Sequence, residues 1–127
     1  MTDLIPQTFR PHERLRDPAA FKRAFERRKS AADASMVVYV VENGMDCARL
    51  GISVGKKKVR KAHDRNRVKR LLREAFRLHK AELPVGVDLV VVPRGPKLTY
   101  EQASTGLVRL ARDAARRLGP RPTAPAR

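Results

Sequence analysis

The densest chemical signal in the sequence is a run of cations over residues 56–80, which holds twelve Lys or Arg residues against only two acids. At its centre stands Arg65-Asn66-Arg67. Arginine carries a planar fork of donors that can hold two phosphate oxygens at once. Asn66 offers both a donor and an acceptor, which suits a sugar hydroxyl or a base edge. The run predicts a phosphate-binding surface. The alternative for the run is a solvated face that only maintains solubility, and the alternative for Asn66 is a residue that only starts a helix.

The element that must position this surface is a helix, because apolar residues recur through the run at helical spacing. They form one stripe of five side chains: Val68, Leu71, Leu72, Ala75 and Phe76. Asp64 is placed to cap the start of this helix. Arg65-Asn66-Arg67 would then open the helix, where free backbone N–H groups and the helix dipole also favour an anion. Residues 55–64 lack periodicity and predict a loop.

Two further helices are indicated by their start and stop signals. Asp17 and Pro18 suit the cap and the first position of a short first helix. Thr99 and Gln102 form a capping box for a last helix, which Gly119 ends.

Three runs of β-branched or alternating residues predict strands at 36–41, 48–54 and 87–92. The turn signal Asn43-Gly44 predicts that the first two strands form a hairpin. The element order is then helix, strand, strand, helix, strand, helix, with room for an extra short strand. This order favours an α/β (α+β) two-layer sandwich in which helices pack on a small mixed sheet.

We expect a single RNA-binding domain over 14–119, an extended arm over 1–13 and a disordered tail over 120–127. The 127 residues include 29 Lys plus Arg and 13 Asp plus Glu, a formal charge of +16 with a pI near 11.3. Such an excess is tolerated most easily when a polyanion neutralises it, and nucleic acid is the expected one. No apolar run approaches the roughly 18–20 residues that span a bilayer, so no membrane partner is expected.

The sequence predicts no catalytic residue and no metal ligand in this chain. His63 beside Asp64 is a poor ligand pair, because adjacent side chains point to different sides; we expect His63 to pack in the loop or donate to phosphate. The three histidines assemble no Ser/His/Asp or Cys/His arrangement. The lone Cys47 and the lack of a secretory signal favour a cytoplasmic location. No obligate protein partner is evident.

Three segments resemble the bacterial ribonuclease P protein family. Residues 65–77 (RNRVKRLLREAFR) closely resemble its signature helix, and residues 50–57 (LGISVGKK) look like the strand and lysines before that helix. Residues 14–25 (RLRDPAAFKRAF), with two phenylalanines four apart, are also similar. The resemblance runs in order over roughly 14–118, and the central motif is specific.

The resemblance implies that the basic helix links two parallel strands by an unusual left-handed βαβ connection. It also implies that a catalytic RNA subunit, using Mg²⁺, removes the 5′ leader from precursor tRNA, while this chain binds no metal firmly. The protein would dock its basic helix on the catalytic RNA. By motif, these RNA contacts fall on Arg65, Asn66, Arg67, Lys69, Arg70 and Arg73.

The resemblance further implies a cleft that grips the leader of precursor tRNA. By motif, the cleft falls on Phe21, Phe25, Tyr39, Ser53, Lys56 and Lys57. The residues themselves agree on one detail, because Arg49, Gly51 and Ser53 share one strand face and small residues there leave room for a nucleotide. The alternative for Phe21 and Phe25 is ordinary core, since two aromatics at this spacing usually pack on a sheet. An exposed base could instead stack on them.

Two departures from the family pattern concern the loop before the basic helix. One extra residue lies between Ser53 and Arg65, and Arg60 stands near a position where the family usually has Gly. Gly permits a turn that Arg tolerates poorly, so the loop path and the reach of its lysines are open. Two rival functions also stay open: a ribosomal protein or assembly factor, and a helix-turn-helix DNA regulator. Strands flanking the basic helix weaken the last.

Overall fold

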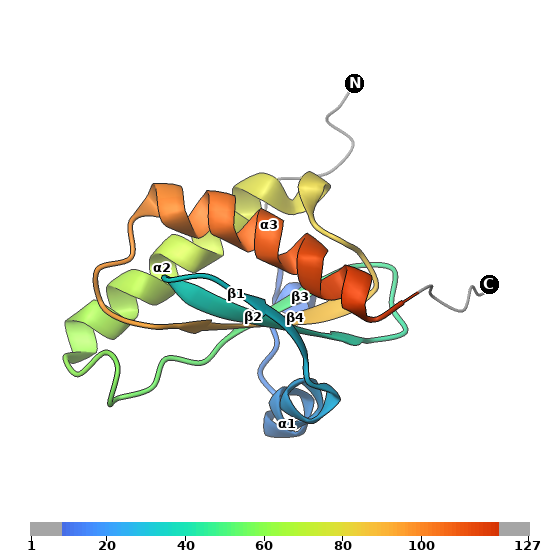
Figure 1. The fold of residues 1–127 in the computed structure, drawn as a ribbon, viewed down its shortest axis with the longest axis horizontal. Helices are drawn as coiled ribbons and strands as arrows, with labels where there is room; N and C mark the ends of the chain where they lie inside the picture. The colour runs from blue at the N-terminus through green and yellow to red at the C-terminus, as the bar shows by residue number, and fades with distance from the viewer. Residues whose placement is uncertain (1–8, 120–127) are drawn as a thin grey trace.

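The computed structural model describes residues 9–119 of the chain. Its helices and strands alternate along this range, with two short 3-10 helices beside them (Figure 1). In chain order they are η2 (Pro11–Glu13), α1 (Pro18–Arg27), β1 (Lys29–Ala32), β2 (Met36–Glu42), β3 (Arg49–Ile52), α2 (Ala62–His79), η3 (Lys80–Glu82), β4 (Val87–Pro93) and α3 (Tyr100–Arg117). The predicted helices and strands are confirmed, and β1 is the extra short strand.

The four strands form one mixed sheet in the order β1-β2-β4-β3. β2 pairs with β1 and β4 antiparallel, whereas β3 runs parallel to β4. The predicted hairpin between β2 and β3 is therefore wrong, because β4 lies between them. β4 is apolar on both faces and almost wholly buried, so it belongs in the centre of the sheet. As the resemblance implied, α2 connects the parallel neighbours β3 and β4; the left-handed sense stays a prediction.

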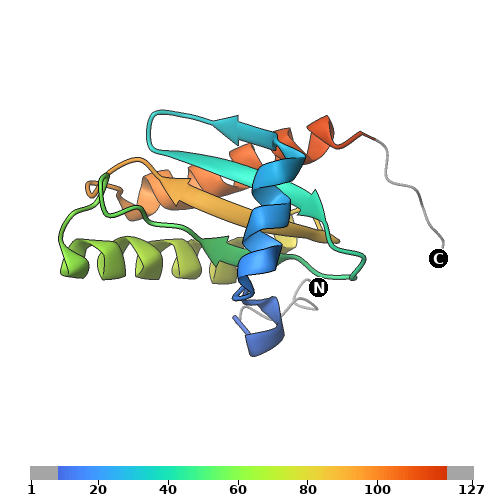
Figure 2. The same cartoon turned by 90° about the horizontal axis from the view of Figure 1, so that it is seen from below.

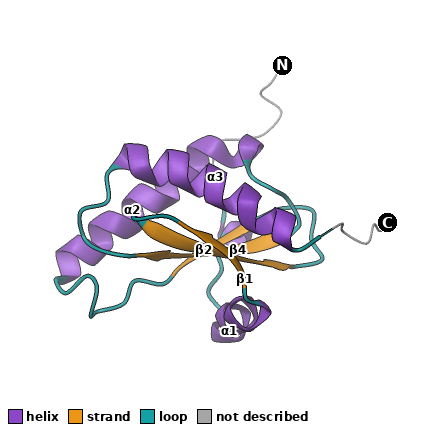
Figure 3. Ribbon diagram, in the orientation of Figure 1, coloured by secondary structure: helices purple, strands orange, loops and turns teal. Residues whose placement is uncertain are grey.

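Helices cover both faces of the sheet. α2 and α3 lie side by side on one face, and α1 crosses the strands on the other (Figures 1, 2 and 3). The larger core cluster fills the first interface with buried side chains such as Met36, Leu72, Phe76 and Leu107. A smaller cluster around Ala24 lies beneath α1. The mixed α+β sandwich is thus confirmed, with α1 as a partial third layer.

The ends of α1 and α3 follow the sequence signals. The Asp17 carboxylate accepts a bond from the Ala19 N–H at 3.0 Å, and Thr99 and Gln102 form the reciprocal capping box. Gly119 follows α3 with a positive φ of 82°, which suits a residue without a Cβ.

The start of α2 departs from the prediction. The helix begins at Ala62, and Lys61 holds the cap position without a side-chain bond. Asp64 lies in the first turn and is not the cap. The Arg65 N–H already donates to the Lys61 carbonyl at 3.1 Å. Arg65-Asn66-Arg67 therefore lie in the second turn, where free N–H groups no longer contribute to anion binding.

The described part of the expected arm is packed against the domain. Pro11–Glu13 form a 3-10 helix, and the Phe9 ring meets the Phe76 ring edge-on at 5.2 Å. The rest of the arm and the expected tail lie outside the described residues. Within residues 9–119 no helix is both long enough and apolar enough to cross a membrane.

Candidate RNA-binding site

The apolar stripe of α2 holds the helix to the sheet and turns its cations outward. Val68, Leu72, Ala75 and Phe76 are all fully buried, as predicted. On the outer side Asn66, Arg70 and Arg73 are exposed, and Lys69 is half-buried. α2 is therefore a fixed, positively charged surface and not a free helix.

Two of the predicted phosphate ligands also hold loops. Arg65 Nη1 donates to the carbonyls of Val59 at 3.0 Å and Arg60 at 2.9 Å, in the loop before α2. Arg67 donates from Nη1 to the Pro96 carbonyl at 3.0 Å and from Nη2 to the Leu98 carbonyl at 2.8 Å. The two arginines thus tie neighbouring loops to α2, and their guanidinium groups have fewer donors left for RNA than Arg70 or Arg73.

The loop before α2 has an ordinary backbone despite Arg60. Among the described non-glycine residues only Arg28 has a positive φ, so Arg60 needs no left-handed conformation. The amides of Lys58 and Val59 both donate to the Gly55 carbonyl, and Val59 is fully buried. This anchored turn keeps the lysines of residues 56–58 exposed.

The predicted cleft residues of α1, β2 and β3 share the sheet face that α1 crosses. Tyr39 of β2 is paired with Val90 of β4, which is paired with Gly51 of β3, so the three form one row across the sheet. The Phe25 ring meets the Tyr39 ring edge-on at 4.9 Å. Phe25 is still 36% exposed and Tyr39 half-buried, which leaves aromatic surface open to a base.

Phe21 belongs to the floor of this face. Its ring approaches Gly51 so closely that a Cβ there would lie 2.7 Å from Cζ of Phe21 and 3.0 Å from Leu15. Gly51 is therefore required by the packing of Phe21, and the room that the sequence suggested for a nucleotide is filled by this ring. Ser53 directly follows β3, and its backbone N–H donates to the Val91 carbonyl at 2.9 Å. Lys56 and Lys57 come next, on the exposed loop.

The other cation on this face, Arg49, is already occupied. It binds the fully buried Asp88 carboxylate through two bonds of 2.7 and 2.8 Å, and Asn43 adds a third at 3.1 Å. The hydrogen bond to Asp88 raises the pKa of the Arg49 guanidinium. Sequence reasoning missed this pair. The signal was Asp88 itself, a lone acid in an apolar strand, which needs a cationic partner when buried.

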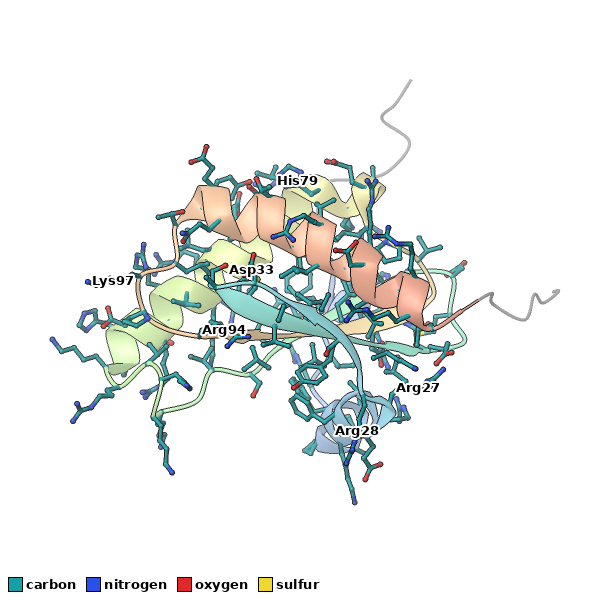
Figure 4. All side chains as sticks on the ribbon, in the orientation of Figure 1. Arg27, Arg28, Asp33, His79, Arg94 and Lys97 are labelled. Carbon is teal, nitrogen blue, oxygen red and sulfur yellow. The ribbon has the colours of Figure 1, made fainter. Side chains whose placement is uncertain are left out.

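The two predicted surfaces meet at β3. Lys69 and Arg73 of α2 line a hollow that is also lined by Phe21 and Gly51. Figure 4 shows Lys97 near the start of α2, on the loop that Arg67 holds. Lys69 and Arg73 of α2 thus reach the edge of the sheet face that α1 crosses, next to Phe21.

Candidate catalytic groups in residues 9–119 have other roles. His63 and Asp64 contact each other at 3.3 Å, although adjacent side chains were expected to diverge. No group of three His, Cys, Asp or Glu side chains able to hold a metal ion occurs in this part of the chain. Burial raises the pKa of the Cys47 thiol, with the Asp46 charge adding to it, which disfavours the thiolate.

A basic helix fixed at the edge of a sheet face with partly exposed aromatic rings is the arrangement expected of a nucleic-acid-binding protein of the α+β class. The family model described as Ribonuclease P matches residues 9–115. The Ribonuclease P protein component of Pseudoalteromonas atlantica is 39% identical over 106 residues, covering 82% of this chain and 88% of that relative. Its namesake in Thermotoga maritima is 44% identical over 97 residues, covering 76% of this chain and 81% of that protein.

The fold agrees with the sequence relatives. The RNase P protein of Staphylococcus aureus superposes with a TM-score of 0.70 at 34% identity, covering 80% of this chain and 94% of that one. The chain belongs to the ribonuclease P protein family. Membership of this family implies a role in tRNA 5′ processing and an RNA partner.

Proposed function

We propose that this chain binds the catalytic RNA of ribonuclease P through α2 and receives the 5′ leader of precursor tRNA on the sheet face crossed by α1. The observation that carries the proposal is the hollow in which Lys69 and Arg73 of α2 meet Phe21 and Gly51, which belong to the sheet face that α1 crosses. Asn66, Arg70 and Arg73 offer donors to phosphate and sugar. Phe25 and Tyr39 offer ring surface to an unstacked base, a contact worth about 1–3 kcal/mol.

We assign the cleavage chemistry to the RNA subunit, with Mg²⁺ as its cofactor. The described side chains do not fit a metal of their own, since they bring no ligand set together. What this chain contributes is binding and orientation, which raises the local concentration of a correctly placed substrate. Positive charge on α2 also replaces counterions around the RNA, so the protein should matter most when Mg²⁺ is scarce.

A processing assay tests the function as a whole. The protein is added to bacterial ribonuclease P RNA at low Mg²⁺, and removal of the 5′ leader from precursor tRNA is followed on a gel. We expect faster cleavage with the protein than without it, and a smaller gain with an Arg70→Gln/Arg73→Gln variant. Absence of any stimulation by the unaltered protein contradicts the proposal.

A binding comparison tests the leader face separately. Tyr39→Ala should weaken binding of leader-bearing precursor tRNA more than binding of mature tRNA, whereas Tyr39→Phe, which keeps the ring, should not. Phe21→Ala should act in the same direction, but its thermal stability must be measured as well because Phe21 packs on Gly51 and Leu15. Equal losses of affinity for both RNAs would contradict binding of the leader at this face.

A further inference from the structure

The chain segment before α1 is fixed along the free edge of β3. Arg14 forms a parallel bridge with Leu50, and the Leu15 N–H donates to the Leu50 carbonyl at 2.9 Å. The Leu15 side chain is only 5% exposed. The side chains on either side of it, Arg14 and Arg16, are exposed. Their backbone positions are therefore set by the sheet, although sequence reasoning assigned neither residue a role.

A buried ion pair fixes the same segment to the end of α2. Glu13 is 6% exposed, and its carboxylate accepts bonds from Lys80 Nζ and from the Arg10 N–H, both at 2.7 Å. Burial acts to raise the pKa of Glu13, but the Lys80 and Arg10 hydrogen bonds outweigh it and leave the pKa lowered. The segment is thus held at both β3 and α2, and side chains of the segment, β3 and α2 line a hollow.

This hollow has a volume of about 250 Å³. Four cationic side chains line it, two from the segment and two from α2: Arg14, Arg16, Lys69 and Arg73. The remaining wall and floor are Phe9, Leu15, Phe21, Leu50, Gly51 and Ile52. It is smaller than the roughly 300–1,000 Å³ typical of small-molecule sites and suits one charged group with a small apolar neighbour.

The charge in the hollow has no counterpart in the described protein. None of the four cations forms an ion pair with an acid of residues 9–119. The Arg14 guanidinium lies 4.8 Å from the centre of the Phe9 ring, a contact that orients it and leaves its donors available. Like charges gathered in this way repel one another until an anion enters.

A larger hollow on the other side of the molecule shows the contrast. It has a volume of about 440 Å³ and lies between α3 and the end of α2. Its arginines are already held: Arg109 pairs with Asp33, Arg112 donates to the Glu82 carbonyl, and Arg116 pairs with Asp113. An anion entering there would have to displace these partners, whereas one entering the hollow beside β3 would not.

We propose that the hollow between residues 9–16, β3 and α2 is a pocket for one phosphodiester group of an RNA strand, with Arg14 and Arg16 as ligands beside Lys69 and Arg73. Phe21 and Gly51 form its floor, so the attached sugar or base packs toward the aromatic face. The pocket joins the cations of α2 to that face in one continuous path. The inference rests on the proposed function only in taking RNA as the ligand.

The pocket is tested first with a strand that has no tRNA or ribozyme structure. The full-length protein and its Arg14→Gln/Arg16→Gln variant are titrated into a fluorescent uridine hexamer at several salt concentrations. We expect binding about tenfold weaker or more, since bonds to charged groups are strong, and a salt slope smaller by about 0.7, because one phosphate contact on a single strand is lost. The matched control is Arg112→Gln/Arg116→Gln, which removes the same net charge from α3 and should change binding less than about threefold.

Three further titrations, with leader-bearing precursor tRNA, mature tRNA and catalytic RNA, decide which RNA supplies the phosphate. A loss with leader-bearing precursor tRNA, but not with mature tRNA or catalytic RNA, assigns the phosphate to the leader. A loss confined to catalytic RNA assigns it to that subunit. Either result supports the pocket.

The proposal fails if Arg14→Gln/Arg16→Gln binds the hexamer and all three RNAs no more weakly than Arg112→Gln/Arg116→Gln does. Thermal unfolding is measured for each variant; if Arg14→Gln lowers stability through its Phe9 contact, Arg16→Gln alone carries the test, and Arg14→Lys should restore binding. A failure of the processing assay would overturn the proposed function while leaving the hexamer result, and hence the pocket, standing.

Discussion

α2 and α3 are equally long helices, 18 residues each, on the same face of the sheet, yet they use their positive charge in opposite ways. Every arginine of α3 has a partner within the described chain: Arg109 with Asp33, Arg112 with the Glu82 carbonyl, Arg116 with Asp113 and Arg117 with the Ser30 carbonyl. On α2, Arg65, Arg67 and Arg77 are held in the same way, but Lys69, Arg70 and Arg73 form no ion pair with an acid of residues 9–119. Composition alone does not distinguish the two helices, and the proposed RNA surface rests on which of their cations lack an internal partner in residues 9–119.

Removing two positive charges from each helix in turn gives the strongest test of this difference. Arg70→Gln/Arg73→Gln on α2 should weaken binding to catalytic RNA by about 30-fold or more, because each side chain donates charged bonds to phosphate. The salt slope should fall by about 1.4–1.8 for two lost contacts. Arg112→Gln/Arg116→Gln on α3 removes the same net charge and should weaken binding by less than about threefold. Equal losses in a salt-dependent titration would show that only net charge matters.

Arg67 is one of the α2 cations that are held within the protein, since its guanidinium holds the loop before α3. Arg67→Lys keeps the charge but cannot reproduce the two bonds to the Pro96 and Leu98 carbonyls. We expect a loss of about 1–2 kcal/mol in the free energy of unfolding, measured with urea, and an unchanged salt slope for RNA binding. Arg112→Lys, which loses a single carbonyl bond, should have about half that effect. A changed salt slope for Arg67→Lys would contradict the loop role.

Lys80, directly after the last residue of α2, forms an ion pair with Glu13. The contribution of this pair to stability can be tested by changing the pH. The folded-state pKa of Glu13 lies below its ordinary value of 4.5, so the pair stabilises the fold fully above that pH. Its contribution is lost as the pH falls below about 4.5 toward the folded-state pKa. In urea unfolding, the stability difference between the native chain and Glu13→Gln should therefore shrink between pH 6 and pH 3. A difference that stays constant would mean that Glu13 is not ionised in this pair.

The smallest effect is expected for the ion pair of Arg109 on α3. Arg109→Gln should lower the free energy of unfolding by less than about 1 kcal/mol, because the Arg109 side chain is half exposed. Asp33 also keeps its bonds from Ser35 and from the Met36 N–H. The loss should diminish in high salt, as screening weakens exposed pairs. RNA affinity should be unchanged; a clear drop in affinity would extend the RNA surface onto α3.

Local signals in the sequence predicted most of the elements that carry the site. The period of Val68, Leu72 and Phe76 set the buried face of α2, and therefore which cations point outward. The Thr99 capping box set the start of α3. These features depend on residues a few positions apart, so they can be read from one segment alone.

The parts that could not be predicted depend on contacts between distant segments. Strand order was misjudged because a turn signal at Asn43-Gly44 says nothing about a strand that arrives 43 residues later at Val87. Arg65 and Arg67 were read as phosphate ligands because their loop carbonyl partners are fixed only by the tertiary fold. The hollow beside β3 was missed for the same reason, since Arg14 and Lys69 come together only when residues 9–16 pair with β3.

The central place of β4 governs the order in which this molecule can assemble. Arg49 of β3 has its register partner at Asp88, so β3 has no strand to pair with until α2 and β4 have been made. Contacts between residues far apart in the sequence slow folding, because the entropy cost of loop closure is met before the contacts that offset it are formed. α2 therefore leaves the ribosome before the sheet that buries its apolar stripe exists. Pulse-labelled hydrogen exchange should show the amides of β3 becoming protected together with those of β4 and never before them.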